Sequence, residues 1–412
     1  MSNNLLTISK ITNEALMVLE NELTFTGQVD RNYDDQFAVV GAKIGQTVNV
    51  RRPGRFIGAV GPQLVVEDFN ESSVPVTLST QFQVSTQFTT QDLALSLDMF
   101  SDRILKPAIA TVANKMDRDG LLVAKNNTAN IVGTAGTAPT GLITYLTAAA
   151  YLDSEGAPRD GRRSVTIEPF TSSTIVDSLK GLFVPTTQIS SQYTKGLMGR
   201  DSGGMNWYMD QNVVSQTFGS YSTATLSCNV TTATGFLSTG WAYSSNITIG
   251  ATSAAATLNQ GDTFTIAGVY AVNPQNRQSY GKLRNFVVQS TTAIGSGGTA
   301  TVTVVPAVIT GGQFQNVSVT STGSQAVTPF NNTGVVSPQN ILMHRNAFTL
   351  ACADLELPEG VHFAGRASDK ELGLSIRVVR QYTINNDSIP TRVDVLYGWA
   401  PLYQELACRV AA

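Results

Sequence analysis

The sequence predicts an α+β protein in which a small β module interrupts a larger domain, and three patterns indicate this arrangement. Residues 211–344 carry only four charged side chains, although 14% of the whole chain is charged. Apolar and polar residues alternate strictly over residues 74–88, which is the period of a β-strand. Apolar residues recur with helical spacing over residues 97–125. The chain outside the charge-poor block therefore contains a helix and strands, and the block is a separate module.

The composition limits the class of protein. A length of 412 residues suggests two or three domains, or one large domain with an insertion. Apolar residues make up 42% of the chain, so sizeable cores can form. The net charge of −3 argues against a surface that neutralises nucleic-acid phosphates, because such a surface concentrates Lys and Arg.

Cysteine usage and hydropathy indicate where the protein is made. Cys228, Cys352 and Cys408 are scattered, and no two lie at metal-ligand spacing. They predict reduced thiols and synthesis in the cytoplasm. We expect no signal peptide, because no basic region followed by a long apolar run opens the chain. We also expect no transmembrane helix, because no apolar stretch approaches the necessary length.

A short amphipathic helix is expected over residues 8–23, where apolar side chains form one stripe. This stripe must be buried, either against its own domain or against a neighbouring molecule. The stripe comprises Ile8, Ile11, Ala15, Val18, Leu19 and Leu23.

Two strands are expected next. Residues 47–52 alternate like a strand and are ended by Pro53 and Gly54. The alternation over residues 74–88 predicts one strand of roughly 50 Å, at about 3.3 Å per residue. A globular core has little use for such a length, so the strand either projects or runs along an extended domain. Pro75 places at least its start at a sheet edge.

The helix expected over residues 97–125 would be roughly 43 Å long. Pro107 either kinks it or marks its first turn, and Gly120 weakens it near its end. The residues Asp117 to Asp119 are predicted to form a solvated or salt-bridged face.

Shorter elements follow outside the module. We expect a strand over residues 164–167 and a helix that begins near Thr171. Alternation over residues 374–384 predicts another strand, and a further strand begins at Val393.

The charge-poor block is predicted to form a small barrel or sandwich, because turn residues separate several short predicted strands. The predicted strands are 223–229, 245–249, 262–272, 285–290, 299–308 and 316–320. The four charged residues of the block are Asp262, Arg277, Lys282 and Arg284.

The sequence contains no constellation typical of catalysis. His344 and His362 are the two histidines, and neither lies in a metal or triad motif, so we expect structural or solvent-facing roles for both. Cys228 has no base beside it and is predicted to be a small buried apolar residue. We therefore predict no enzyme, with no catalytic, cofactor-binding or metal-binding residues and no cofactor.

A cluster of charges flanks the loop between the first two predicted strands. One interpretation is a solvated hairpin tip with internal ion pairs, which contribute little to stability. The other is a projecting arm whose charges meet a neighbouring subunit, in which case charge reversal of its arginines impairs assembly but not folding. The cluster comprises Arg51, Arg52, Arg55, Glu67, Asp68 and Glu71.

Several segments, in this order, resemble the major capsid proteins of tailed bacteriophages and herpesviruses, and in particular the coat proteins of short-tailed Salmonella phages, which carry a β insertion. Two segments are similar to the long helix of the family and two to the part just before its insertion. The others resemble a strand of the insertion and the terminal strand. The segments are DRILKPA (102–108), VANKMD (112–117), QYTKGL (192–197), GGM (203–205), GDTFTIAGV (261–269), VLYGW (395–399) and ELA (405–407).

This resemblance implies an α+β capsid fold with an N-terminal arm, an extended loop, a spine helix, peripheral and axial domains, and an inserted small β-barrel domain. The implied boundaries are 1–40 for the arm, 41–92 for the extended loop and peripheral strands, 93–127 for the spine helix, 128–221 for the first axial part, 222–334 for the inserted domain, 335–373 for the second axial part and 374–412 for the C-terminal strands.

The resemblance also implies a function. Copies of the chain assemble as pentamers and hexamers into an icosahedral shell around double-stranded DNA, through a procapsid that forms on a scaffolding protein and then expands. The implied partners are other copies of the chain, a scaffolding protein, a portal protein and DNA that is packaged without sequence-specific contact, and no membrane is involved. The implied location is the virion capsid, assembled in the cytoplasm of the host bacterium.

One departure from the family changes the expected contacts. The family's insertion can carry an acidic loop, but residues 235–245 have no charge. We therefore expect an apolar contact through Phe236, Trp241 and Tyr243, because Trp and Tyr favour interfaces.

Two alternatives stay open at this level. A phage tail or surface adhesin could use Trp241 and Tyr243 of its β insertion to stack sugars, although adhesins rarely need a long helix. A cellular nanocompartment shell of the same fold is the other, and we expect it to lack the insertion. We also expect residues 222–334 to fold when expressed alone.

Overall fold

A computed structural model describes residues 15–19, 22–31, 47–67, 71–89, 106–178, 202–221, 224–231, 235–331, 333–369 and 373–412. Its contacts divide the chain into two compact units. The first unit comprises Met1–Val50, Pro75–Gly120 and Phe348–Ala400, and the second comprises Arg51–Val74, Leu121–Ala347 and Pro401–Ala412. Both helices and strands are present, which confirms the α+β prediction.

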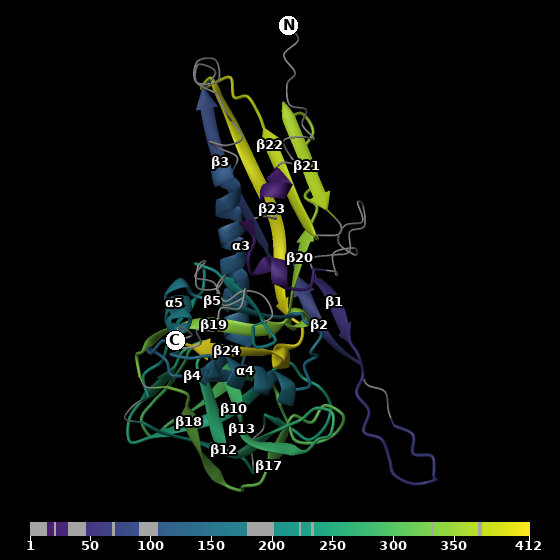
Figure 1. The fold of residues 1–412 in the computed structure, drawn as a ribbon, viewed down its shortest axis with the longest axis vertical. Helices are drawn as coiled ribbons and strands as arrows, with labels where there is room; N and C mark the ends of the chain where they lie inside the picture. The colour runs from purple at the N-terminus through teal and green to yellow at the C-terminus, as the bar shows by residue number, and fades with distance from the viewer. Residues whose placement is uncertain are drawn as a thin grey trace, which may run out of the picture. The chain divides into compact units, whose positions relative to one another are not determined.

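The first unit is built on a sheet of long strands (Figure 1). The sheet has the order β20-β23-β22-β21, and a fifth strand outside this order, β3, pairs with β23. β23 is antiparallel to both β22 and β3, and it pairs with the whole length of β3. The strands are β3 (Thr80–Thr89), β20 (Phe348–Ala353), β21 (Phe363–Asp369), β22 (Leu374–Arg380) and β23 (Ser388–Pro401).

The single strand expected over residues 74–88 is two strands. β2 (Ser72–Thr77) pairs with β1 (Thr47–Arg52), whereas β3 pairs with β23, and Leu78 and Ser79 lie between them outside any strand. The alternation nevertheless continues across the break, because Val74, Val76 and Leu78 are buried while Gln81, Gln83 and Ser85 are exposed. The predicted faces are correct. The predicted continuity is wrong, because the chain exchanges one pairing partner for another.

The N-terminal segment is held by the long helix α3 (Lys106–Asn127). The carboxylate of Asp117, on this helix, accepts hydrogen bonds from the backbone N–H of Thr24 at 2.7 Å and of Thr26 at 2.8 Å, and also from the Thr26 hydroxyl. Asp117 is buried, so the prediction of a solvated residue is wrong for it. The prediction of a salt-bridged residue is correct for Asp119, which pairs with Lys115 one helical turn away.

Parts of the first helices lie outside the described residues. The described helical residues near the N-terminus are 15–19 and 22, and the stripe residues Ala15 and Leu19 are buried there, as is Leu23 just beyond. A 3-10 turn, η1 (Thr26–Gln28), follows. Residues 97–105 of the expected long helix are not described.

Gly120 of α3 lies in a tight aromatic contact within the first unit. A Cβ atom at this position would lie 2.5 Å from the Trp399 ring and 2.9 Å from the Phe25 ring. These two rings pack together, with centroids 5.7 Å apart. The glycine therefore permits close packing and does not merely weaken the helix.

Gly120→Ala is expected to destabilise the protein by about 1–3 kcal/mol, as overpacking of a core does, although alanine is the better helix former by about 1 kcal/mol. Urea unfolding of the full chain measures the difference. Gly141→Ala, with no atom within 4 Å of the new Cβ, is the matched control. An increase in stability for Gly120→Ala would contradict the packing argument.

The second unit contains a mixed sheet covered by two helices. Its order is β4-β24-β19-β5-β6, and β7 also pairs with β19. The helix α4 packs its buried face, including Tyr145 and Leu152, against sheet residues such as Val165 and Leu342. The elements are β4 (Ile131–Gly133), α4 (Ile143–Ser154), β5 (Arg163–Ile167), α5 (Pro169–Ser178), β6 (Asn206–Met209), β7 (Ser215–Thr217), β19 (Val336–His344), η5 (Arg345–Ala347), η6 (Gln404–Leu406) and β24 (Ala407–Ala411).

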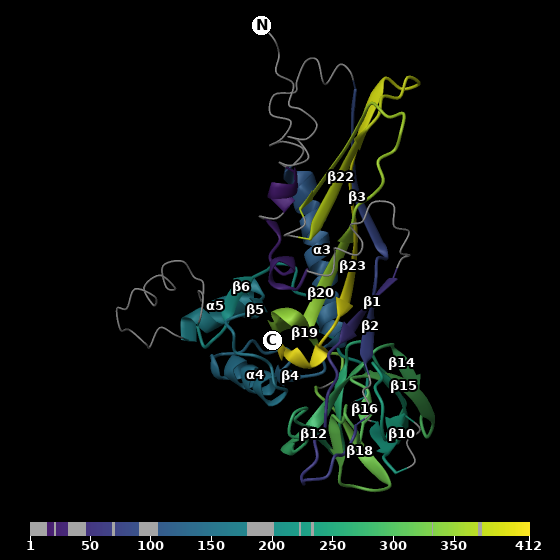
Figure 2. The ribbon, with the colours of Figure 1, turned by 90° about the vertical axis from the view of Figure 1, so that its right-hand side faces the viewer.

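The inserted module is a closed barrel of six strands (Figures 1 and 2). The order β13-β15-β10-β8-β18-β12 closes because β12 also pairs with β13, and a seventh strand, β17, lies at the edge of β12. The barrel prediction is thus confirmed over the sandwich. The strands are β8 (Thr225–Asn229), β10 (Ser245–Thr252), β12 (Thr263–Val272), β13 (Ser279–Val288), β15 (Thr299–Val305), β17 (Val317–Val319) and β18 (Ser324–Pro329).

The predictions of the individual strands were less accurate than the prediction of the barrel. The predicted strand 316–320 is β17, which is outside the closed ring, whereas β18, inside the ring, was not predicted. β18 buries one side chain, Val327, so its sequence lacks an apolar alternation. Short pairs complete the module, namely β9 (Phe236–Leu237) with β16 (Val308–Ile309), and β11 (Ala256–Leu258) with β14 (Thr292–Ile294).

The chain enters and leaves the barrel through a paired stem. β7 and β19 are antiparallel, with Thr217 opposite Val336. Phe218 and Tyr221, on the entering side, are part of the barrel's apolar core. An isolated fragment of residues 222–334 therefore lacks several side chains of its own core, since Ile131, Ala135 and Ala411 also belong to it.

Candidate interaction surface and its anchors

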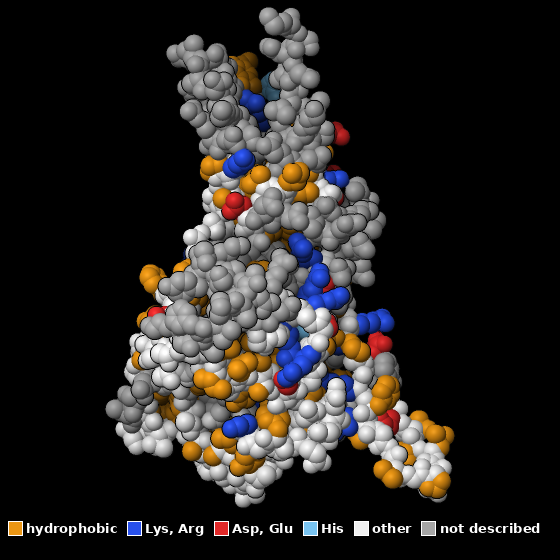
Figure 3. All heavy atoms as spheres, viewed as in Figure 1, with side chains coloured by type: hydrophobic (Ala, Val, Ile, Leu, Met, Phe, Trp, Pro, Cys, Tyr) orange, Lys and Arg blue, Asp and Glu red, His pale blue; other side chains and the backbone are white. Residues whose placement is uncertain are grey.

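The loop between β1 and β2 exposes an unusual amount of apolar surface. Its described residues, 53–67 and Glu71, contain no helix or strand. Six large apolar side chains are exposed there, and Val60 and Leu64 are the most exposed of them, at 108% and 90%. Figure 3 shows hydrophobic side chains gathered at the end of the loop. Such a patch on a soluble protein indicates an interaction site. We call Phe56, Ile57, Val60, Leu64, Val65 and Val66 the loop patch.

The root of this loop is held by a buried ion pair. Arg52 and Arg55 both donate to Oε1 of Glu405, at 2.5 Å and 3.1 Å. The guanidinium of Arg52 also lies 4.4 Å from the ring centroid of Tyr403 and 5.8 Å from that of Trp241, which adds cation–π attraction. Burial opposes ionisation of Glu405, but the charges of Arg52 and Arg55 outweigh it, and its pKa lies below the ordinary value. These contacts therefore hold the first residues of the loop in place.

Glu405→Gln is expected to destabilise the protein at neutral pH by about 1.5–3 kcal/mol, because it weakens hydrogen bonds to charged groups. Because the folded-state pKa is depressed, this contribution is complete above pH 4.5 and is lost as the pH falls through the folded value. Urea unfolding of both proteins at several pH values between 7 and 3.5 should show the difference shrinking in acid. A difference that stays constant would contradict the ion pair.

The other predicted loop charges are bound within the loop. Arg51 pairs with Glu71 at 3.5 Å, and the Glu67 carboxylate accepts hydrogen bonds from the backbone N–H of Ile57 at 2.8 Å and of Gly58 at 2.5 Å. Asp68 lies outside the described residues. A contact with a neighbouring subunit stays a prediction for all of them. Charge reversal of Arg52 would break a buried pair, so only Arg51 tests that contact without disturbing the fold.

The three aromatic residues of the barrel contact their own chain. Tyr243 donates a hydrogen bond to Asn127 Oδ1 at 2.7 Å, and Trp241 packs on a small cluster that includes Phe314. Phe236 packs against the barrel core. All three are half-buried. Their role in an apolar contact between subunits stays a prediction.

A second buried ion pair joins the barrel to the rest of its unit. Arg284 of β13 donates to Glu155, which follows α4, and each side chain is only 3% exposed. The hydroxyl of Tyr280 donates to the same carboxylate oxygen at 3.0 Å. Removing one member of such a pair leaves the other charge buried and unpaired.

A third buried polar cluster lies where the barrel meets β7 and β24. The carboxylate of Asp262 accepts hydrogen bonds from the backbone N–H of Gly219 at 3.0 Å and from the Gln216 side chain at 2.9 Å. Gln216 in turn accepts from Lys125 at 2.6 Å, and Arg409 donates to the carbonyl of Gly261 at 2.8 Å. Burial and the neighbouring Arg409 charge lower the pKa of Lys125 to about 8. Two of the four charges in the barrel are thus buried anchors.

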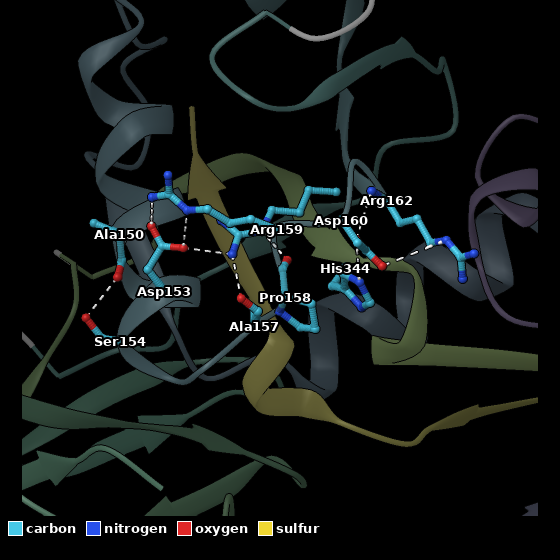
Figure 4. A network of polar contacts seen from close by, with 10 residues as sticks. Ala150, Asp153, Ser154, Ala157, Pro158, Arg159, Asp160, Arg162 and His344 are labelled. Atoms are coloured by element: carbon cyan, nitrogen blue, oxygen red, sulfur yellow. Dashed lines mark hydrogen bonds and ion pairs between the residues drawn. The ribbon is translucent and has the colours of Figure 1, made fainter. Parts of the chain in front are cut away.

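The turn that carries Glu155 is fixed by the network in Figure 4. Arg163 of β5 donates to Asp153 at 2.7 Å and to the carbonyl of Ala157 at 2.7 Å. Arg159 donates to the same Asp153 carboxylate at 2.9 Å. His344 is buried and lies 3.1 Å from Asp160, so it has a structural role, as predicted. The residues on both sides of Glu155 are therefore linked to β5 by hydrogen bonds.

Several of these residues were not found from the sequence. Glu155 and Glu405 lie in no motif, and their partners are distant in the chain. The rare charges Asp262 and Arg284 were visible, but only as exceptions in a neutral block. The loop patch had a signal that was overlooked, because Phe56, Ile57 and residues 64–66 are apolar runs within a Gly- and Pro-rich loop.

No group of three or more His, Cys, Asp or Glu side chains among the described residues is arranged to hold a metal ion. The three cysteines are free and buried, and burial raises the pKa of Cys228 to about 11. Among the helices that the structure describes, none has the length and apolar character needed to cross a membrane.

Comparisons with known proteins identify the family. A family model described as P22 coat protein, gene protein 5, matches residues 1–407. The chain is therefore the major capsid protein of a tailed phage, a structural component of the virion capsid that assembles with copies of itself, and it is not an enzyme. It belongs to the P22 coat protein family. This confirms the resemblance to the coat proteins of short-tailed Salmonella phages and replaces the adhesin alternative.

The solved structures to which the chain is similar include several from phages. The capsid of Ralstonia phage GP4 is 8% identical, with 94% of this chain and 88% of that chain covered and a TM-score of 0.47. A structure of Mycobacterium phage Che8 is 10% identical, with 94% and 90% covered and a TM-score of 0.45. The mature capsid of bacteriophage PhiM1 is 11% identical, with 94% and 86% covered and a TM-score of 0.45. A comparison with curated proteins gives no match.

Proposed function

We propose that the loop patch binds a neighbouring copy of the chain and that this contact drives closure of the shell. The exposed patch carries the proposal, because six apolar side chains on an otherwise unstructured loop have little role within the folded chain. The buried Arg52–Glu405 pair supports it, since a loop fixed at its root pays less conformational entropy on binding. Many such contacts, individually weak, allow misplaced copies to dissociate while the closed shell is stable.

The named parts of the capsid fold belong to the same proposal. The β1–β2 pair and residues 53–67 are the extended loop, α3 is the spine helix, and the barrel is the inserted domain. The sheet around β19 with α4 and α5 is the axial domain, and the strands β3 and β23 belong to the peripheral domain. The order of these elements supports the assignment.

The complete assembly is an icosahedral shell of pentamers and hexamers, formed as a procapsid on a scaffolding protein and expanded during packaging of double-stranded DNA through a portal. Assembly takes place in the cytoplasm of the host bacterium. The net charge of −3 supports a wall that does not bind DNA tightly, because tight binding needs clustered Lys and Arg.

Electron microscopy of the purified full chain, with and without the scaffolding protein of its phage, tests this function. We expect uniform closed shells with scaffold, and irregular or no shells without it. Uniform shells in the absence of scaffold would contradict templated assembly, and a chain that stays monomeric under both conditions would contradict the proposed function.

A further inference from the structure

A turn of the barrel is bonded to the loop that carries the loop patch. This turn, residues 273–278, joins β12 to β13, and Arg277 Nη2 donates a hydrogen bond to the backbone carbonyl of Phe56 at 2.8 Å. Asp262 and Arg284 also bond to residues outside the inserted domain. Three of the four charged residues in the charge-poor block therefore connect the barrel to other parts of its unit, and Arg277 connects it to the loop.

The turn that carries Arg277 is held in one conformation. Arg277 has a φ of 54°, in the left-handed region that few residues other than glycine adopt. Its N–H donates to the Asn273 carbonyl at 2.9 Å, and the Asn273 side chain accepts from the N–H of Gln275 at 2.9 Å and donates to the Ser154 carbonyl at 2.7 Å. Because a left-handed arginine costs free energy, its presence at a contact indicates that the contact has a function.

The contact at Phe56 lies beside the point where the two limbs of the loop are joined. The next two residues, Ile57 and Gly58, donate their backbone N–H groups to the carboxylate of Glu67, at 2.8 Å and 2.5 Å. Residues 59–66, between these bonded positions, include four of the six side chains of the loop patch. Holding Phe56 in place therefore restricts the part of the loop that bears most of the patch.

Close packing between the start of the loop and the turn is incomplete. A cavity of about 330 Å³ is lined by residues 52–55 of the loop and by Pro274 and Gln275 of the turn. Well-packed side chains fix the relative positions of two segments, and here part of that packing is missing. Directed polar contacts are therefore needed, and the bond from Arg277 adds one farther along the loop than the Arg52–Glu405 pair.

We propose that the β12–β13 turn of the barrel positions the loop patch, with Arg277 as the positioning residue. The loop is then held at two points along its length, and two fixed points define its direction where one does not. A loop held in this way loses less conformational entropy when it binds. The effect on assembly rests on the proposed function of the loop patch, whereas the position of the loop in the free chain does not.

Spin labels in the free full chain measure the position of the loop. Labels at Gln63→Cys in the loop and Ser296→Cys in the turn between β14 and β15 occupy exposed positions, and the three native cysteines are buried. Arg277→Asn removes the contact but suits the backbone, because asparagine tolerates the left-handed region. We expect the distance distribution between the labels to become at least twice as wide, while the urea midpoint of unfolding does not fall. An unchanged width would overturn the proposal, and a lower midpoint would overturn the strain argument.

Matched variants separate this role from general effects of charge and fold. Lys282→Asn removes an exposed positive charge from the same hairpin and should leave the width unchanged, and equal broadening would overturn the specific role of Arg277. Arg277→Lys keeps a cationic N–H donor and should restore most of the narrow distribution. Should the asparagine variant not fold, Arg277→Gly, which accepts a positive φ without strain, repeats the comparison.

A second pair of labels, at Ala150→Cys on α4 and Ser296→Cys, reports on the barrel itself, because Ala150 is also exposed. We expect this distribution to be the same in every variant. Broadening of the second pair as large as that of the first would show that the whole barrel has loosened, and would overturn the assignment of the effect to the loop.

Assembly separates this inference from the proposed function. The concentration of Arg277→Asn needed for shells should rise roughly five-fold, because a released loop loses more entropy on binding, and Arg277→Lys should lie closer to the unaltered chain. Normal assembly of Arg277→Asn, when a chain with Leu64→Ser, Val65→Ser and Val66→Ser fails to assemble, would overturn the role of positioning in assembly. Normal assembly of both would overturn the proposed function instead, and the label distances would still decide whether the turn positions the loop.

Discussion

Replacing Leu64, Val65 and Val66 together by serine should prevent shell assembly without unfolding the chain. These side chains are exposed in the free chain, so the free energy of unfolding should change by about 0.5 kcal/mol or less. If each side chain is buried between subunits, its loss costs roughly 1.5–3 kcal/mol per contact. Since about 1.4 kcal/mol is a factor of ten, the concentration needed for assembly should rise at least a hundred-fold.

Light scattering during assembly, sedimentation velocity and electron microscopy measure this effect. Ile384→Ser is the matched control, because Ile384 is similarly exposed, at 81%, but belongs to the first unit, whereas the loop patch belongs to the second. We expect the control to assemble as the unaltered chain does. Normal shells from the triple variant at the usual concentration would show that the loop patch is not part of the assembly contact.

Replacing Glu155 by alanine should destabilise the chain by about 3–5 kcal/mol, the largest effect expected of any single substitution considered. The reason is that Arg284 stays buried, with its charge unpaired. The double variant Glu155→Met with Arg284→Met should recover most of this loss, because an apolar pair of similar volume needs no counter-charge.

Urea unfolding of the unaltered chain, Glu155→Met, Arg284→Met and the double variant measures the coupling between the two residues. Arg159→Ala provides the control, since it removes an exposed member of a neighbouring ion pair and should cost less than about 1 kcal/mol. A loss below 1 kcal/mol for Glu155→Ala, or a double variant as unstable as the single one, would show that the pair does not hold the barrel.

The sequence was informative where one local pattern decides a structure. The break in charge density located the barrel, and the strict alternation correctly assigned the buried face of β2 and the less exposed face of β3. It could not show that the chain changes pairing partner at Leu78, because both partners favour the same alternation. β18 was missed because the neighbouring strands, and not its own side chains, supply most of its stabilisation.

The buried ion pairs are features that a single sequence does not predict. The residues Glu155 and Arg284, like Arg52 and Glu405, pair over long distances in the chain, and nothing around them differs from an ordinary surface charge. The burial of Asp117 was missed for the same reason, since its carboxylate accepts hydrogen bonds from a segment about ninety residues away. The exposed loop patch, by contrast, was readable as apolar runs in a loop that lacks any partner strand.

The paired stem has a consequence for engineering. Because β7 and β19 are hydrogen-bonded neighbours, the two points at which the barrel joins its host lie about one strand spacing apart, roughly 4.8 Å. A foreign domain with adjacent termini can therefore be grafted onto this stem without stretching the host. The graft would leave Glu155 and Arg409 without their barrel partners, so these two positions must be neutralised in the same design.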